Sequence, residues 1–84
     1  MSYQIIFSKH FQRDFDDLEF VMQQRILLAI EKVKESPFSA AIKLKDTLQG
    51  KYRVRVGDYR IRFDVLETKV FLHRVGHRKD IYRV

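Results

Sequence analysis

The hydrophobic pattern of the chain changes near its middle, from a helical period to strict alternation. Residues 3–7 form a short β-prone run at the start. Phe11, Phe15 and Leu18 then fall at i, i+4 and i+7, on one face of a helix. Ser8 stands just before this stretch and suits the N-cap position. The start of the chain therefore predicts a strand followed by a short helix.

A second, longer helix is predicted from about residue 21 to residue 35. Pro37 ends it, because the residue before a proline is pushed out of the helical region. The hydrophobic pattern of residues 37–50 is less regular, and Gly50 is expected to interrupt regular secondary structure before the next element. The apolar stripe of the second helix consists of Met22, Ile26, Ala29, Ile30 and Val33.

Apolar and polar residues alternate beyond residue 51, which predicts strands. Residues 52–56 and 59–65 each carry apolar side chains at every second position. The dipeptide 57–58 (Gly-Asp) joins them as a two-residue loop with glycine first, which suits a type II′ hairpin turn. Residues 69–75 form a third run that is apolar on both faces over residues 70–72, as in a central strand, and Gly76 is expected to end this strand.

A second two-residue turn, at residues 67–68, sets the expected register of the last strand. It would place His73 opposite Arg62. It would also place Arg60 opposite Val75, so that the end of the chain emerges beside Arg60.

The element order β-α-α-β-β-β predicts an α+β fold, with a helical hairpin packed on one face of a mainly antiparallel sheet. The 84 residues make one domain, residues 1–84. The chain has no cysteine, which excludes a disulfide framework and a thiolate nucleophile. No apolar run approaches the ~20 residues of a membrane span, and no signal peptide is evident. These features predict a cytoplasmic protein without a membrane partner.

Charge is distributed very unevenly along the chain. Residues 1–50 carry 7 basic and 7 acidic residues, whereas residues 51–84 carry 10 basic and 4 acidic residues. The whole net charge of +6 therefore lies in the predicted strands and the tail. Such an asymmetry is typical of a protein with a polyanionic partner, most often a nucleic acid.

The predicted hairpin places like charges opposite each other. With a loop at residues 57–58, Arg55 faces Arg60 and Arg53 faces Arg62. Such pairs destabilise a sheet by some tenths of a kcal/mol each when solvated. A solvated face is one interpretation of these arginines. A bridging anion explains the cluster better, because the guanidinium fork binds phosphate in a bidentate manner.

Proton transfer would fall to His73, His77 or Tyr82, since arginine does not act as a base near neutral pH. His77 is otherwise a solvated tail histidine, and Tyr82 is otherwise a packing residue. His73 and His77 stand four residues apart but straddle the expected strand end, and no third ligand is evident. The chain has no glycine-rich phosphate loop. Neither a metal nor a cofactor is expected.

Two stretches resemble the RelE/ParE superfamily of toxins from toxin–antitoxin modules. They are LQGKYRVRVGDYRI at residues 48–61 and VGHRKDIY at residues 75–82. The Gly-Asp-Tyr-Arg turn and the Gly-His-Arg…Tyr ending carry the resemblance together. The upstream strand and helical hairpin also match, so the resemblance covers about residues 3–84.

The resemblance to RelE-like members implies a ribosome-dependent mRNA interferase. Such a protein binds mRNA in the ribosomal A site, beside ribosomal RNA, and cleaves it by attack of a 2′-hydroxyl on the adjacent phosphate, without a metal. It also implies an acidic antitoxin as partner. By this resemblance Arg60 binds the reacting phosphate, Arg78 stabilises developing charge, and Tyr82 stacks on the nucleotide or donates a proton. His77 would transfer a proton. The expected RNA-binding residues are Arg53, Arg55, Arg62, Lys43 and Lys45.

Two features keep a second interpretation open. Arg53 and Arg55 stand where some active members carry lysines, and little chain follows Tyr82. ParE-like members share the fold but inhibit DNA gyrase and lack the nuclease residues. A ParE-like toxin, a catalytically degenerate member, or a plain RNA-binding module therefore remain alternatives. The joint presence of Arg60, Arg78 and Tyr82 favours the nuclease.

Overall fold

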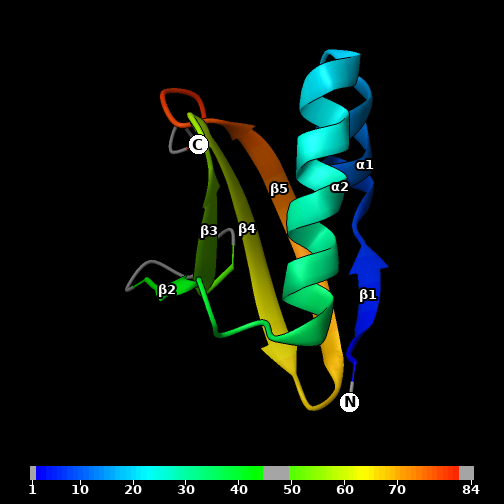
Figure 1. Ribbon diagram of the computed structural model, residues 1–84, viewed down its shortest axis with the longest axis vertical. Coiled ribbons are helices and arrows are strands. Elements are labelled where there is room, and N and C mark those ends of the chain that lie inside the picture. The colour runs from blue at the N-terminus through cyan, green and yellow to red at the C-terminus, as the bar shows by residue number, and fades with distance from the viewer. Residues whose placement is uncertain (1, 45–49, 82–84) are drawn as a thin grey trace.

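The computed structural model describes residues 2–44 and 50–81. Within these residues two helices pack on one face of a mixed five-stranded sheet, which confirms the predicted α+β class (Figure 1). The elements are β1 (Gln4–Phe7), α1 (Lys9–Asp16), α2 (Phe20–Glu35), β2 (Ile42–Lys43), β3 (Tyr52–Val56), β4 (Tyr59–Leu66) and β5 (Lys69–His77).

The strands lie in the order β1-β5-β4-β3-β2. β1 pairs with β5 in parallel, because the chain crosses over through both helices between them, and the other pairs are antiparallel. β5 is an interior strand between β1 and β4, as its apolar character predicted, with Val70, Leu72 and Val75 buried. The core lies between the helices and this sheet. It consists of Phe11, Ile26, Ile30, Val33, Val54, Ile61, Phe63, Val70, Leu72 and Val75.

Ser8 is the N-cap of α1, as predicted. Its Oγ accepts a hydrogen bond from the backbone N–H of Phe11 at 3.0 Å and donates one to the carbonyl of His73 at 3.0 Å. The backbone N–H of Ser8 also donates to the carbonyl of Leu72 at 3.1 Å. A single serine therefore begins the helix and ties it to the edge of β5.

The segment between α2 and β3 is more ordered than expected. Ile42 and Lys43 form a two-residue strand that pairs with Arg53 and Tyr52. Because β2 is so short, the part of β3 from Val54 to Val56 pairs with no strand on that side among the described residues. This leaves an open strand edge next to α2.

The β3–β4 hairpin has the predicted register. Val56 pairs with Tyr59, and the pairing continues to Tyr52 and Phe63. Gly57 has a φ of +60°, which fits glycine at the first position of a type II′ turn.

The predicted register of β5 holds only as far as Phe63, which pairs with Leu72. An irregularity follows, so that Arg62 pairs with Arg74 and Arg60 pairs with Gly76. The expectation that His73 lies opposite Arg62, and Arg60 opposite Val75, is therefore wrong by one residue. The physical reason lies at the edge of β5 beyond β1. There, the side chains of Ser8 and Asp14 form hydrogen bonds with the backbone of His73 and Val75, where a paired strand would otherwise bond.

Gly76 also does not end the last strand, which continues to His77. The tail turns back over this glycine. A Cβ at Gly76 would meet atoms of Ile81 at 3.9–4.0 Å, an ordinary contact distance. A methyl group at residue 76 would therefore fit beside Ile81.

We expect Gly50→Ala to lower the free energy of unfolding by about 3 kcal/mol. Gly50 has a φ of +108°, and a Cβ there would lie 2.8–2.9 Å from backbone atoms of Phe63. Chemical denaturation measures the loss. Gly76→Ala is the matched control and should cost no more than about 1 kcal/mol. Similar losses for both variants would contradict this account of Gly50.

Candidate functional site

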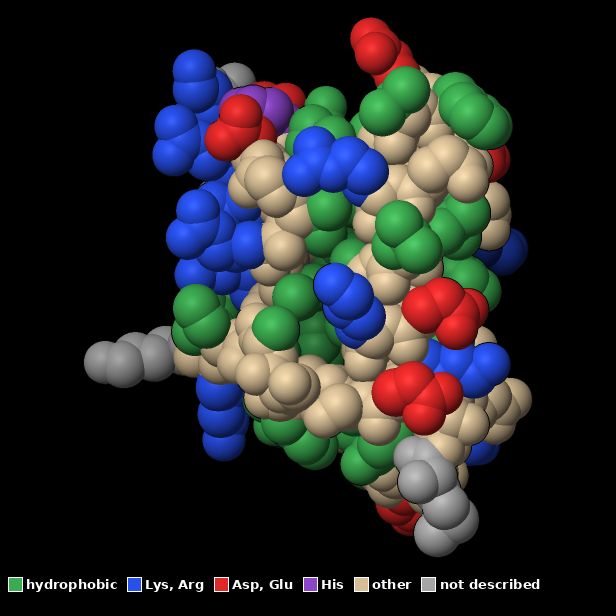
Figure 2. Space-filling view, in the orientation of Figure 1, with side chains coloured by type: hydrophobic (Ala, Val, Ile, Leu, Met, Phe, Trp, Pro, Cys, Tyr) green, Lys and Arg blue, Asp and Glu red, His purple; other side chains and the backbone are tan. Residues whose placement is uncertain are grey.

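Four arginines of the β3–β4 hairpin lie on the side of the sheet away from the helices, and we call them the arginine face: Arg53, Arg55, Arg60 and Arg62. Arg53 pairs with Arg62, and Arg55 pairs with Arg60, as the hairpin predicted. Their neighbours Val54 and Ile61 point into the core, so the arginines point the other way. Lys and Arg side chains gather along the β3 side of the molecule (Figure 2).

Arg62 is only 2% exposed. Its Nη2 donates to the carbonyl of Gly50 at 2.8 Å. This bond attaches the start of the β3 segment to the sheet. The family resemblance led us to expect that Arg62 binds RNA. In this structure its side chain is buried and donates a hydrogen bond to the backbone of Gly50.

Arg60 is 6% exposed and is held at the hairpin turn. Its Nη1 donates to the carbonyls of Gly57 at 2.8 Å and Tyr59 at 2.9 Å. Its Nε is buried and has no hydrogen-bond partner among the described residues. The alternating pattern suggested four exposed arginines, yet two are buried, while Arg53 is half-buried and Arg55 is exposed.

The structure brings Arg78 to the same turn. The backbone N–H of Arg78 donates to the carbonyl of Asp58 at 2.7 Å, and its side chain is exposed. Arg60, bonded to the adjacent Gly57, lies at this end of the sheet too. The predicted convergence of the hairpin and the tail is therefore present, although the register that produces it differs.

His77 and His73 occupy different environments. The ring of His77 packs edge-on against Tyr59, with centroids 5.5 Å apart. Its Nδ1 accepts a hydrogen bond from the backbone N–H of Lys79 at 3.1 Å. A neutral His77 in this arrangement carries its proton on Nε2, so it can donate a hydrogen bond through Nε2. His73 instead has its Nε2 2.9 Å from Oδ2 of Asp64.

Arg74 belongs to the basic half of the chain but is paired with an acid. Its Nε and Nη2 donate to the two carboxylate oxygens of Asp14 at 2.6 and 3.1 Å. This hydrogen bonding raises the pKa of the Arg74 guanidinium. Asp14 also accepts from the backbone N–H of Val75 at 3.2 Å, so it pins α1 to β5. Sequence periodicity gives no sign of this pair, whose members are 60 residues apart.

The remaining predicted residues fall in two groups. Lys43 is exposed on β2, beside β3. Tyr82 and Lys45 lie outside the described residues.

Among residues 2–44 and 50–81, no group of three or more His, Asp or Glu side chains is arranged to hold a metal ion. No helix in the described part of the chain is long and apolar enough to cross a membrane.

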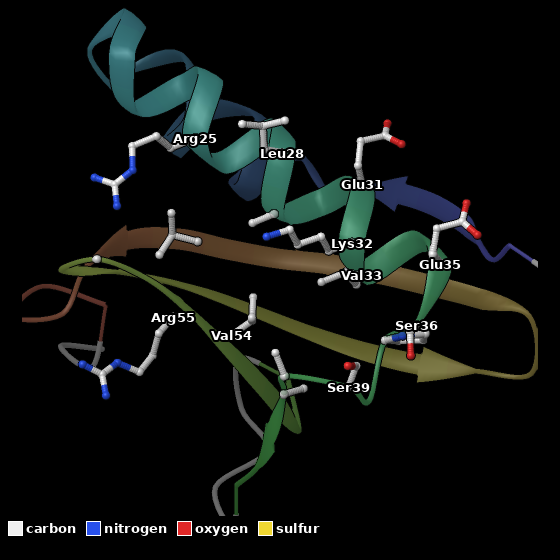
Figure 3. A pocket seen from close by; sticks show the side chains of 16 residues that line it. Arg25, Leu28, Glu31, Lys32, Val33, Glu35, Ser36, Ser39, Val54 and Arg55 are labelled. Atoms are coloured by element: carbon white, nitrogen blue, oxygen red, sulfur yellow. The ribbon is translucent and has the colours of Figure 1, made fainter.

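A groove of about 850 Å³ runs between α2 and β3, and we call it the α2–β3 groove (Figure 3). Its floor is apolar, with Leu28, Ala29, Val33, Val54 and Val56. Its rim carries charged side chains of α2 and β3. The labelled rim residues in Figure 3 are Arg25, Glu31, Lys32, Glu35 and Arg55.

The fold matches solved toxin structures. The toxin–antitoxin complex RelBE2 from Mycobacterium tuberculosis contains a chain with a TM-score of 0.82 and 25% identity, covering 93% of this chain and all of that one. The RelB–RelE antitoxin–toxin complex from Methanococcus jannaschii gives a TM-score of 0.73 at 33% identity, covering 92% and 94%. An archaeal RelE–RelB complex from Pyrococcus horikoshii OT3 gives 0.78 at 23% identity, covering 95% and 99%. The protein thus has the RelE toxin fold.

Sequence comparison identifies the family. The model for the "ParE toxin of type II toxin-antitoxin system, parDE" matches residues 5–82. Toxin RelE3 from Methanocaldococcus jannaschii is 35% identical over 82 residues, which are 93% of each chain. The chain therefore belongs to this family of type II toxin–antitoxin toxins, and it is RelE-like.

We expect Arg62→Ala to lower the free energy of unfolding by about 2 kcal/mol, because the carbonyl of Gly50 loses its buried donor. Arg55→Ala removes the same charge from an exposed side chain of the arginine face. It should change stability by no more than about 0.5 kcal/mol. Urea denaturation of both variants provides the comparison. Equal stability of the two variants would show that Arg62 is not a structural residue.

Proposed function

We propose that this toxin is an mRNA endonuclease that acts on the ribosome, in the cytoplasm. The convergence of Arg60 and Arg78 on the turn at residues 57–58 carries the proposal. No carboxylate pairs with either guanidinium among the described residues. Two arginines at one turn, neither of them in an ion pair among the described residues, are suited to a phosphate that gains charge during reaction.

The proposed reaction is a transesterification. The 2′-hydroxyl loses its proton to water as its oxygen forms a bond to phosphorus, and the bond from phosphorus to the 5′-oxygen breaks. The products are a cyclic 2′,3′-phosphate and, once the 5′-oxygen has gained a proton, a free 5′-hydroxyl. Arg60 would bind the phosphate and Arg78 would stabilise the charge that develops on its oxygens. His77, as the imidazolium, would give the proton on its Nε2 to the leaving 5′-oxygen and become neutral. Tyr82 would stack on the nucleotide.

Neighbouring cations would bind the rest of the RNA. Arg53, Arg55, Lys43 and Lys45 are proposed contacts to mRNA or ribosomal RNA phosphates. Arg62 is proposed instead to support the site through Gly50, because its side chain is buried. The reacting groups lie on a strand face and a turn, so the ribosome would have to position the substrate.

Removing a cation from the turn should affect the chemical step more than binding. Arg60→Ala and Arg78→Ala are each expected to slow single-turnover cleavage of mRNA on ribosomes by on the order of 10²-fold. Ribosome affinity should change far less. Arg13→Ala, which removes an exposed cation of α1, is the charge-matched control. Unchanged cleavage by both site variants would remove the nuclease proposal.

The proposed partner that restrains the toxin is an acidic antitoxin, and the α2–β3 groove is its proposed binding surface. The two complexes cited above at 25% and 33% identity are described as toxin–antitoxin complexes. An extended segment paired with the open edge of β3 would place alternate side chains on the apolar floor. The basic residues beside it suit an acidic chain.

Antitoxin binding can be tested with two exposed apolar residues of α2. Leu28 is 65% exposed and lines the groove, whereas Val21 is 70% exposed and does not. Leu28→Glu should weaken binding of the antitoxin encoded beside this chain by at least tenfold, since it buries a charge in the interface. Val21→Glu should leave the affinity within about threefold. Calorimetry measures both. Equal effects would place the antitoxin elsewhere.

A second function is favoured by the name of the matching family model. ParE-like toxins are non-enzymatic inhibitors of DNA gyrase, and the match covers residues 5–82. A gyrase supercoiling assay with the wild-type protein separates the two functions. Inhibition of gyrase without any ribosome-dependent cleavage would select the ParE-like function.

A further inference from the structure

Arg25 belongs to the helical layer, yet its guanidinium lies on the β3–β4 turn. Measured from the position that a Cβ would take on Gly57, Nη2 of Arg25 is at 3.0 Å, Nη1 at 3.4 Å and Cζ at 3.6 Å. Figure 3 shows the side chain extending from α2 across the end of the groove. Because Gly57 has no side chain, the guanidinium can lie directly against the backbone of the turn.

Gly57 is therefore in contact with two arginines. Arg60 donates to its carbonyl at 2.8 Å, and the guanidinium of Arg25 lies where a side chain of residue 57 would project. The next residue, Asp58, accepts a hydrogen bond from the backbone of Arg78. The guanidiniums of Arg25 and Arg60 and the backbone of Arg78 thus meet at a two-residue turn, and we call these three arginines the turn cradle.

The turn cradle has an excess of positive charge. The ion pairs found among the described residues involve His73 with Asp64 and Arg74 with Asp14, not the three arginines of the cradle. Asp58 is the acid of the turn itself and is exposed. Three guanidiniums and one carboxylate leave a net charge of +2. Like charges that share one turn repel each other, more weakly in water than in a dry interior. A bound anion would convert this repulsion into attraction.

We propose that Arg25 binds a backbone phosphate of the RNA, next to the phosphate held by Arg60 and Arg78. The inference rests on the proposed nuclease function. It extends the RNA-binding surface from the arginine face, around the turn, onto α2. Phosphodiester is the fitting ligand because a guanidinium makes paired hydrogen bonds to its two free oxygens. The sequence gives no indication of this role, since Arg25 stands among the solvent-facing positions of a helix.

Salt-dependent binding to a short 2′-O-methyl RNA tests the inference without cleavage, because this probe lacks the attacking hydroxyl. Each phosphate contact on a single strand contributes about 0.7 to the slope of log K against log salt. Arg25→Ala should reduce the slope by about that amount and weaken binding several-fold at low salt. Arg25→Lys should keep the slope, since the charge remains, and lose part of the affinity.

Arg13→Ala is the matched control, because Arg13 is an exposed arginine on the other helix. It removes the same net charge far along the chain from the turn and should leave the slope unchanged. Thermal unfolding checks that all three variants fold. Should Arg25→Ala bind the RNA like Arg13→Ala, or should the wild-type protein bind the RNA without salt dependence, the inference fails.

A cleavage assay on ribosomes separates this inference from the proposed function. The wild-type protein could bind the RNA probe with a salt slope that depends on Arg25 and yet not cleave mRNA. That result supports phosphate binding by Arg25 and overturns the nuclease function. Wild-type protein that cleaves mRNA, with a slope that Arg25→Ala does not alter, supports the nuclease and overturns the cradle.

Discussion

Hydrogen bonding of buried arginines to backbone carbonyls is the interaction on which this structure depends. Arg62 binds the carbonyl of Gly50, and Arg60 binds those of Gly57 and Tyr59. A buried guanidinium needs partners to offset its desolvation. Carbonyl oxygens supply hydrogen bonds without cancelling the charge, as a carboxylate would. The segment at Gly50 and the turn at residues 57–58 are thereby fixed to the sheet, while the two arginines retain their positive charge.

Arg74 shows the opposite arrangement. Asp14 binds its guanidinium through both carboxylate oxygens, so this cation adds little to the field of the molecule. The same carboxylate accepts the N–H of Val75 and fixes the end of β5, from which the tail leaves. The charge of Arg74 is therefore neutralised within the fold, whereas Arg60 has no carboxylate partner among the described residues.

Local patterns in the sequence predicted the parts of the fold that local physics controls. The alternation on either side of Gly57 sets the hairpin register, because a two-residue loop allows one pairing. The irregularity at His73 could not be predicted, since it involves contacts from Ser8 and Asp14 far along the chain. The burial of Arg60 and the position of Arg25 were missed for a similar reason. A hydrophobic period of 2 or 3.6 residues assigns polar residues to the solvent-facing side of a strand or a helix. Only the tertiary structure shows which of these polar residues lie close together.

β3 connects the two surfaces that this protein would use. Val54 and Val56 line the α2–β3 groove, Arg53 lies on the arginine face, and Arg55 belongs both to that face and to the rim of the groove. A protein segment added to the open edge of β3 would lie between these surfaces and within reach of both. An acidic segment bound there would lower the positive potential felt by RNA without contacting Arg60 itself. Because a single strand presents both surfaces, binding of an antitoxin and binding of RNA are expected to oppose each other through charge as well as through overlap.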